Sequence, residues 1–145
     1  MISFKEFFES YEEDVVGINI NDTLKDFTSL ILSGDKKIET RDSKNNGIQD
    51  LLNRGVSRVG LISVNSKRKP TALVVGYATI GDPIHYRTEE EFRADEDSHR
   101  VYKGDPYDFK VKKYGYPLSD VIRVKEPFIP AQTKGVIKTR RLFKA

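Results

Sequence analysis

The chain has 145 residues, with 25 lysines and arginines against 22 aspartates and glutamates, and a formal net charge of +3. This length is typical of one domain, and it can bury a core without disulfides or structural metals. The lack of cysteine excludes disulfides and thiolate metal sites and suits a reducing compartment. No apolar run approaches the ~20 residues that span a bilayer, and the first residues do not have the pattern of a signal peptide. We therefore expect a cytoplasmic protein that does not contact a membrane.

The first twenty residues are expected to form an N-terminal helix and a lead-in to the core. We place the core at residues 21–145 and treat residues 1–145 as one domain. Four aromatic residues recur at helical spacing in segment 3–13: Phe4, Phe7, Phe8 and Tyr11. Such a stripe either packs on the core or offers a docking surface. The apolar run 15–20 follows, where Gly17 permits a bend.

A second helix is predicted over residues 23–32, followed by a polar strand. Asn21 or Asp22 is the expected N-cap, and Gly34 stands where a helix ends with positive φ. The chain then runs extended over 36–41, where side chains alternate between the two faces of a strand. The charged residues there are predicted to gather on one side: Lys36, Lys37, Glu39 and Arg41. The sequence thus predicts a compact mixed-charge cluster at a helix-to-strand junction.

The residue pattern in the middle of the chain predicts a short helix followed by a hairpin. Residues 48–53 form the helix, which Gly55 closes. The β-rich runs 58–64 and 71–80 flank a turn-rich linker, so they are predicted to pair as an antiparallel hairpin. The tip of this hairpin carries three consecutive basic residues: Lys67, Arg68 and Lys69.

The last third predicts one more helix, a polar segment and two strands. Thr88 and Glu91 form a capping box that opens a short acidic helix. Residues 95–107 are polar and are expected to form a loop or a broken helix over one mouth of the sheet. Strands are predicted at 118–124 and 136–143. These patterns and short connections indicate an α+β fold with a strongly curved, mostly antiparallel sheet.

Segment 30–41, L-I-L-S-G-D-K-K-I-E-T-R, resembles the signature of the ASCH domain, a small β-barrel related to the PUA fold. It contains the pattern G-x-K-x-x-E-x-R, formed by Gly34, Lys36, Glu39 and Arg41. Later parts of the chain resemble the family's strands in the same order: segment 60–78, Y-G-Y-P-L-S-D-V at 114–121, and P-x-x-P…K-G at 127–135. The resemblance covers most of the chain from Leu24 onward. It implies a single-domain PUA-like antiparallel β-barrel with flanking helices.

The resemblance also implies an RNA- or nucleotide-binding domain with a ligand cleft at the motif. Lysine and arginine hold phosphate, arginine offers a two-pronged fork, and glutamate accepts from an exocyclic amine of a base. The predicted ligand contacts are Lys36, Glu39, Arg41, His99 and Tyr114, with segment 95–107 as a lid. His99 is alternatively an ordinary loop histidine, and Tyr114 is alternatively a half-buried strand tyrosine.

A hydrolase is the first alternative. Some relatives in the wider family resemble amidohydrolases that remove an acyl group from a modified cytidine, with a threonine nucleophile, a lysine activator and a later glutamate. Lys36 matches the lysine, but Glu39 stands at the threonine position, and Thr40 is expected to face the other way. An enzyme that acts on an N4-acetylcytidine-like nucleoside or on RNA therefore stays an alternative. Its catalytic residues would be Lys36 and Glu39, with Glu39 as general base toward water. The candidates for the later glutamate are Glu89, Glu90, Glu91 and Glu96.

A second alternative is a protein-interaction adaptor that uses the aromatic N-terminal helix. Basic clusters meanwhile predict contacts with nucleic-acid phosphates. The candidates are the hairpin tip, Lys67, Arg68 and Lys69, and the C-terminal residues Lys134, Lys138, Arg140 and Arg141. These charges alternatively do no more than solvate loops and edges. With two histidines and no cysteine, we expect no metal and no cofactor, and RNA, a nucleotide or a nucleoside as partner.

Overall fold

The computed structural model describes residues 14–130 and 137–140. Within these ranges the chain forms seven strands and four short helices. In chain order they are β1 (Asp14–Asn21), α2 (Phe27–Ser33), β2 (Ile38–Arg41), α3 (Gly47–Asn53), β3 (Arg58–Val64), β4 (Ala72–Ile80), β5 (Ile84–Tyr86), α4 (Glu89–Ala94), α5 (Glu96–His99), β6 (Lys113–Phe128) and β7 (Ile137–Arg140). The predicted α+β class is confirmed.

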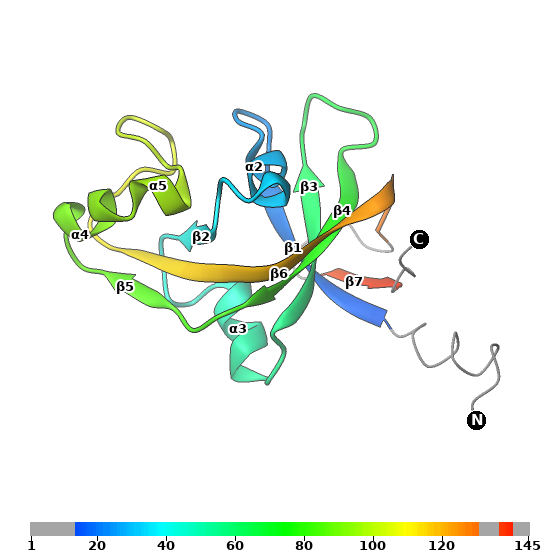
Figure 1. Cartoon of the computed structure of the whole chain (residues 1–145), viewed down its shortest axis with the longest axis horizontal. Helices are drawn as coiled ribbons and strands as arrows, with labels where there is room; N and C mark the ends of the chain where they lie inside the picture. Colours follow the sequence, from blue (N-terminus) through cyan, green and yellow to red (C-terminus); the bar gives the residue numbers. More distant parts are fainter. Residues whose placement is uncertain (1–13, 131–136, 141–145) are drawn as a thin grey trace.

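The strands form one curled sheet in the order β2-β6-β4-β3-β1-β7, and β5 also pairs with β6. The long strand β6 runs along most of the molecule, with α4 and α5 at one of its ends (Figure 1). The first half of β6 pairs with β2 and β5, and its second half pairs with β4. Among the described strands, β2 and β7 form the two ends of this order and do not pair with each other. The sheet is therefore a half-barrel.

The predicted hairpin is confirmed, because β3 and β4 pair antiparallel from Arg58 opposite Thr79 to Val64 opposite Ala72. The described sheet is mostly antiparallel, as expected, with one parallel pair, because β1 runs parallel to β3. Parallel neighbours need a long crossover connection. Here residues 22–57 supply it, and they carry α2, β2 and α3. The crossover is thus what carries the motif strand β2 to the far end of the sheet from β1.

Helix α2 begins at Phe27, later than the predicted start at residue 23, and its N-cap is Asp26 rather than Asn21 or Asp22. The Asp26 side chain accepts a hydrogen bond from the Ser29 amide. Asp22 is instead buried, where it accepts from the Thr28 amide and hydroxyl and from the Ser63 hydroxyl. This carboxylate therefore connects the end of β1 to α2 and β3. The helix ends at Gly34 with φ 89°, as predicted.

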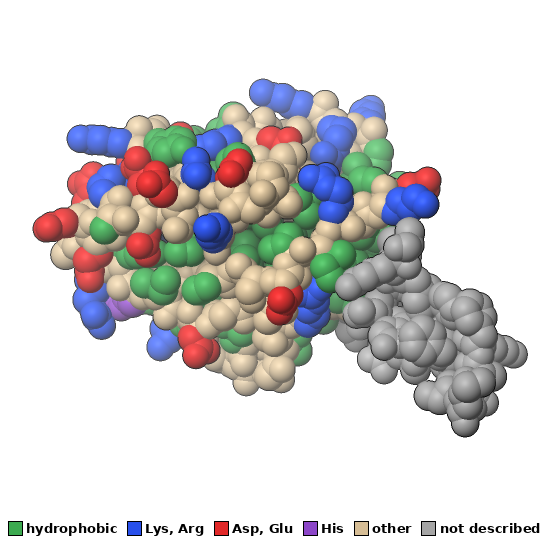
Figure 2. Space-filling view, viewed as in Figure 1, with side chains coloured by type: hydrophobic (Ala, Val, Ile, Leu, Met, Phe, Trp, Pro, Cys, Tyr) green, Lys and Arg blue, Asp and Glu red, His purple; other side chains and the backbone are tan. Residues whose placement is uncertain are grey.

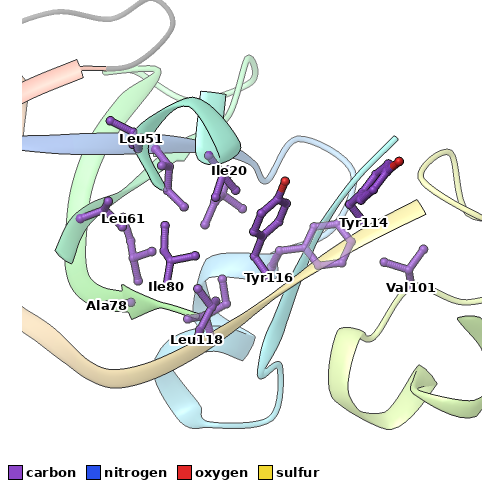
Figure 3. Close-up of a cluster of buried hydrophobic side chains, with 14 of the residues drawn as sticks. Ile20, Leu51, Leu61, Ala78, Ile80, Val101, Tyr114, Tyr116 and Leu118 are labelled. Atoms are coloured by element: carbon purple, nitrogen blue, oxygen red, sulfur yellow. The ribbon is translucent and has the colours of Figure 1, made fainter. Parts of the chain in front are cut away.

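The core lies inside the curl of the sheet and is closed by side chains from α2 and α3. Figure 3 shows Ile20, Leu51, Ile80 and Tyr116 gathered at its centre, with Tyr114 on β6 and Val101 of the loop after α5 to one side. Burying apolar side chains of this kind contributes roughly 1.5–3 kcal/mol each. The two helices thus hold the strands that carry the motif against a packed support.

The remaining elements agree with the predictions in part. The capping box of Thr88 and Glu91 opens α4, and segment 95–107 contains the short helix α5 followed by a loop, so a broken helix was the correct alternative. The strand predicted at 118–124 is one part of the longer β6. The predicted helix 3–13 lies outside the described residues. None of the helices in the described ranges is long and apolar enough to cross a membrane.

Candidate functional site

A cavity of about 290 Å³ opens between the end of β1, strand β2, the start of β6 and the loop after α5. Its volume lies at the lower end of the range for small-molecule sites, ~300–1,000 Å³. The lining residues are Asn19, Ile20, Asn21, Phe27, Lys36, Glu39, Thr40, Arg41, Asp42, Val101, Tyr107 and Lys113. Three residues of the motif therefore share one cavity, and residues of segment 95–107 form part of its wall.

Glu39 sits between the two cations of the motif. Its Oε1 lies 3.5 Å from the Lys36 Nζ, and its Oε2 accepts from the Arg41 guanidinium at 2.5 Å. The side chains of Lys36 and Glu39 are 1% and 8% exposed, and that of Arg41 is 26% exposed. Lys37 is exposed and does not line the cavity, so its predicted place in the cluster is wrong. Lys36 turns inward from the start of the strand, as predicted.

Backbone carbonyl groups complete the environment of both cations. The Lys36 Nζ donates to the His99 carbonyl at 2.5 Å and lies 4.8 Å from the centre of the Phe27 ring. The Arg41 guanidinium donates to the carbonyl groups of Thr40 and Asn19, both at 2.9 Å. Arg41 thereby ties β2 to β1, which are not neighbours in the sheet. The charged cluster thus connects two strands of the curled sheet that no backbone pairing joins.

Burial and charge act in opposite directions on the two buried groups. Burial lowers the pKa of Lys36, and the nearby Glu39 carboxylate only partly restores it. Burial also raises the pKa of Glu39, but the charges and hydrogen bonds of Arg41 and Lys36 outweigh this effect and hold the pKa of Glu39 below its ordinary value. Glu39 is therefore a firmly ionised carboxylate, which makes it a weak base.

His99 is placed differently from the prediction, because its ring is buried in the core and does not line the cavity. The ring stacks on Phe92 with centroids 3.9 Å apart. Its Nε2 lies 2.7 Å from the Phe92 carbonyl, and its Nδ1 accepts from the Val101 amide at 3.0 Å. Burial lowers the pKa of His99, so the ring is neutral. The contribution of His99 to the site is its own carbonyl group, which binds Lys36.

Tyr114 also lies outside the cavity lining. It is buried opposite Arg41 in the pairing of β2 with β6, and its ring stacks on His85 with centroids 4.5 Å apart. The half-buried alternative for Tyr114 is therefore closer to the structure than a ligand-stacking role. Thr40, which was expected to face away from the cavity, is among the residues that line it.

Asp42 and Lys113 are cavity residues that the sequence analysis missed. The Lys113 Nζ forms an ion pair with the Asp42 carboxylate across the β2–β6 junction. Asn19, Asn21, Phe27 and Tyr107 were missed as well. The family motif contains none of these residues. The pairing of β2 with β6 brings Asp42 and Lys113 together from positions 71 residues apart, and no local pattern marks such a pair.

The basic hairpin tip does not line this cavity. Lys67 and Lys69 are exposed, whereas the Arg68 guanidinium donates to Ser63, Pro70 and Thr71 of its own hairpin. Figure 2 shows lysine and arginine side chains on the side of the molecule where this hairpin and the end of β6 lie. Lys138 and Arg140 belong to β7, at the other end of the strand order from β2. Lys134 and Arg141 lie outside the described residues.

Nothing in the described ranges of the chain groups three or more histidine, aspartate or glutamate side chains as a metal site requires. A comparison with protein-family models finds no match, and a search of curated proteins finds no related sequence. The resemblance to the ASCH domain therefore stays a prediction that depends on the motif and on the order of the later segments.

Proposed function

We propose that this chain is an RNA- or nucleotide-binding domain of the ASCH, PUA-like type, and that its ligand enters the cavity around the G-x-K-x-x-E-x-R motif. The observation that carries the proposal is the convergence of Lys36, Glu39 and Arg41 on one cavity of about 290 Å³. Buried charges cost free energy unless they are paired, and replacing them by apolar groups is often neutral or stabilising. A fold that gathers three such groups at the wall of an open cavity thus favours a ligand-binding role.

The lining of the cavity also suits a nucleotide. Phe27 and Tyr107 offer aromatic surface for a base, and Asn19 and Asn21 offer amide groups for polar edges. Arg41 is the partly exposed member of the motif, and none of the hydrogen bonds among the described residues uses its Nε. We therefore assign direct ligand contact to Arg41.

The role of Glu39 differs from the sequence hypothesis. Both of its carboxylate oxygens face cations of the protein itself, so it holds Lys36 and Arg41 in place rather than accepting a proton from a base amine. Its lowered pKa also argues against a role as general base. The geometry thus supports binding more strongly than the Glu39-based hydrolase.

A hydrolase remains the second candidate because of Lys36. An amine whose pKa burial has lowered can take a proton from water or from a hydroxyl group, and Thr40 lines the same cavity. The substrate would be an N-acylated nucleoside, with water adding to the acyl carbon and the amine of the base leaving.

One experiment tests both candidates. The purified protein is incubated with a panel of nucleosides, N-acylated nucleosides, nucleotides and short RNAs, and mass spectrometry measures retained ligand and product. We expect a retained nucleotide or RNA without product, and we expect Arg41→Ala to weaken its binding by roughly 10- to 100-fold in affinity. Arg87→Ala, which changes an exposed arginine near α4, is the matched control. Product that forms with the wild type and disappears in Lys36→Met favours the hydrolase, and no retention of any member refutes the binding proposal.

A further inference from the structure

The ion pair of Lys113 and Asp42 is unequal in its burial. The Lys113 side chain is 2% exposed, whereas the Asp42 side chain is 62% exposed, although both residues line the cavity. A buried ammonium group requires a partner that stays in place. The partner of Lys113 is a carboxylate on the surface, which water and other anions can reach.

The charges around the cavity do not balance. Three cations line it, Lys36, Arg41 and Lys113, against two carboxylates. Glu39 is buried and pairs with both Lys36 and Arg41, whereas the carboxylate that pairs with Lys113 is Asp42. If Asp42 turned toward solvent, the cavity would hold three cations against one carboxylate. The site therefore has room for one further negative group, and its place is at Lys113.

We propose that the ligand of this cavity carries a phosphate group and that Asp42 occupies the place of this phosphate on Lys113 until the ligand binds. The inference rests on the proposed function and narrows it to ligands that carry a phosphate monoester, which are free nucleotides or an RNA end with a terminal phosphate, as opposed to nucleosides. A phosphate monoester carries about −1.5 to −2 charges at pH 7 and three acceptor oxygens. It neutralises the cavity more completely than Asp42 does, and Arg41 and Lys113, which line the same cavity, both offer donors to its oxygens.

The exchange has a defined consequence for each partner. Asp42 gives up an ion pair but is already largely hydrated, so its release costs little. Lys113 exchanges a single carboxylate for a group with more charge and more acceptors. The interaction that forms with phosphate is therefore stronger than the one that Asp42 gives up, which favours nucleotide over nucleoside.

Titration calorimetry at fixed ionic strength tests the inference on the four ribonucleosides and their 5′- and 3′-monophosphates. We expect at least one monophosphate to bind roughly 10- to 100-fold more tightly than its nucleoside, the usual contribution of a hydrogen bond to a charged group. Lys113→Met keeps the apolar stem of the lysine and is expected to abolish this preference. Asp42→Asn removes the competing carboxylate and is expected to tighten monophosphate binding more than it changes nucleoside binding. Lys110→Ala, an exposed lysine before β6, is the control.

The outcomes separate this inference from the proposed function. If nucleosides and monophosphates bind equally well, the inference is wrong and the binding function stands. If none of the probes and no short RNA binds, the proposed binding function itself is refuted, and the phosphate inference with it. If Asp42→Asn weakens nucleoside and monophosphate alike, Asp42 contacts the ligand itself and the exchange is refuted. The asparagine of Asp42→Asn keeps an acceptor oxygen for the buried Lys113, and circular dichroism checks that both variants are folded, so the exchange is judged from whichever variant folds.

Discussion

Substituting Glu39 by glutamine removes the charge that holds the two cations of the motif while keeping the shape of the side chain. Removing one partner of a buried ion pair usually costs ~3–5 kcal/mol, because the other charge stays buried. Lys36 bears this cost in full, since its side chain is only 1% exposed, whereas Arg41 is 26% exposed and gains hydration. The glutamine oxygen also keeps one hydrogen bond. We therefore expect a decrease near the lower end, ~3 kcal/mol in the free energy of unfolding.

The pH dependence of this decrease follows from the two pKa shifts. The pKa of Glu39 is lowered in the folded protein, so its stabilisation is present above the unfolded pKa and is lost as the pH falls through the folded pKa. The pKa of Lys36 is lowered as well, so stability rises with pH between its folded pKa and its ordinary value of 10.5. Without Glu39 the pKa of Lys36 falls further, and this rise begins at a lower pH. The difference between wild type and variant is thus largest near neutral pH and narrows on both sides.

Urea unfolding followed by circular dichroism, at pH values from 3 to 10, measures this difference. A decrease of ~3 kcal/mol corresponds to a decrease in Tm of roughly 6–12 °C for a domain of this size. Asp50→Asn is the control, because Asp50 pairs with Arg54 on the exposed surface of α3. It is expected to change stability by no more than ~0.5 kcal/mol. A Glu39→Gln variant that matches this control at pH 7, or that shows the same decrease at every pH, would refute the buried-charge reasoning.

Two further predictions concern the strand framework and the basic tip. Gly115→Ala places a methyl group 2.7 and 2.8 Å from two buried side chains, so it should lower the free energy of unfolding in urea by ~1–3 kcal/mol. Gly34→Ala is the comparison: its methyl group meets open space, and only the φ of 89° costs stability, ~1 kcal/mol. Equal decreases would contradict the close packing of β6. Alanine at both Lys67 and Lys69 should reduce the slope of log affinity against log salt for single-stranded RNA by ~0.7 for each phosphate that a lysine no longer neutralises. Arg68→Ala should instead lower stability, since its guanidinium is bound within the hairpin. An unchanged slope would leave the two lysines as solvating charges.

Features that depend on neighbouring residues could be predicted from the sequence. The hairpin of β3 and β4, the positive φ of Gly34 and the capping box of Thr88 each follow from a local pattern, and each is found in the structure. The start of α2 could not be predicted in this way. Asp22 has the sequence context of an N-cap, but a hydrogen bond from Ser63, 41 residues away, holds it in the core instead. Tertiary partners therefore overrode a correct local preference.

In the candidate site, too, the features set by neighbouring residues could be predicted from the sequence and those set by distant residues could not. Strand alternation correctly places Glu39 and Arg41 on one side, because that face depends only on the backbone period. It does not reveal that Glu39 is occupied on both oxygens, that Lys36 finds the carbonyl of His99, or that Lys113 joins the cavity. Each of these facts depends on a residue more than sixty positions away or on how one carboxylate is shared. They change the proposed roles, since Glu39 holds two cations of the protein itself and we propose that Arg41 and Lys113 recognise the ligand. The discrimination between ligands is accordingly expected to depend on phosphate charge at Lys113 rather than on a base amine at Glu39.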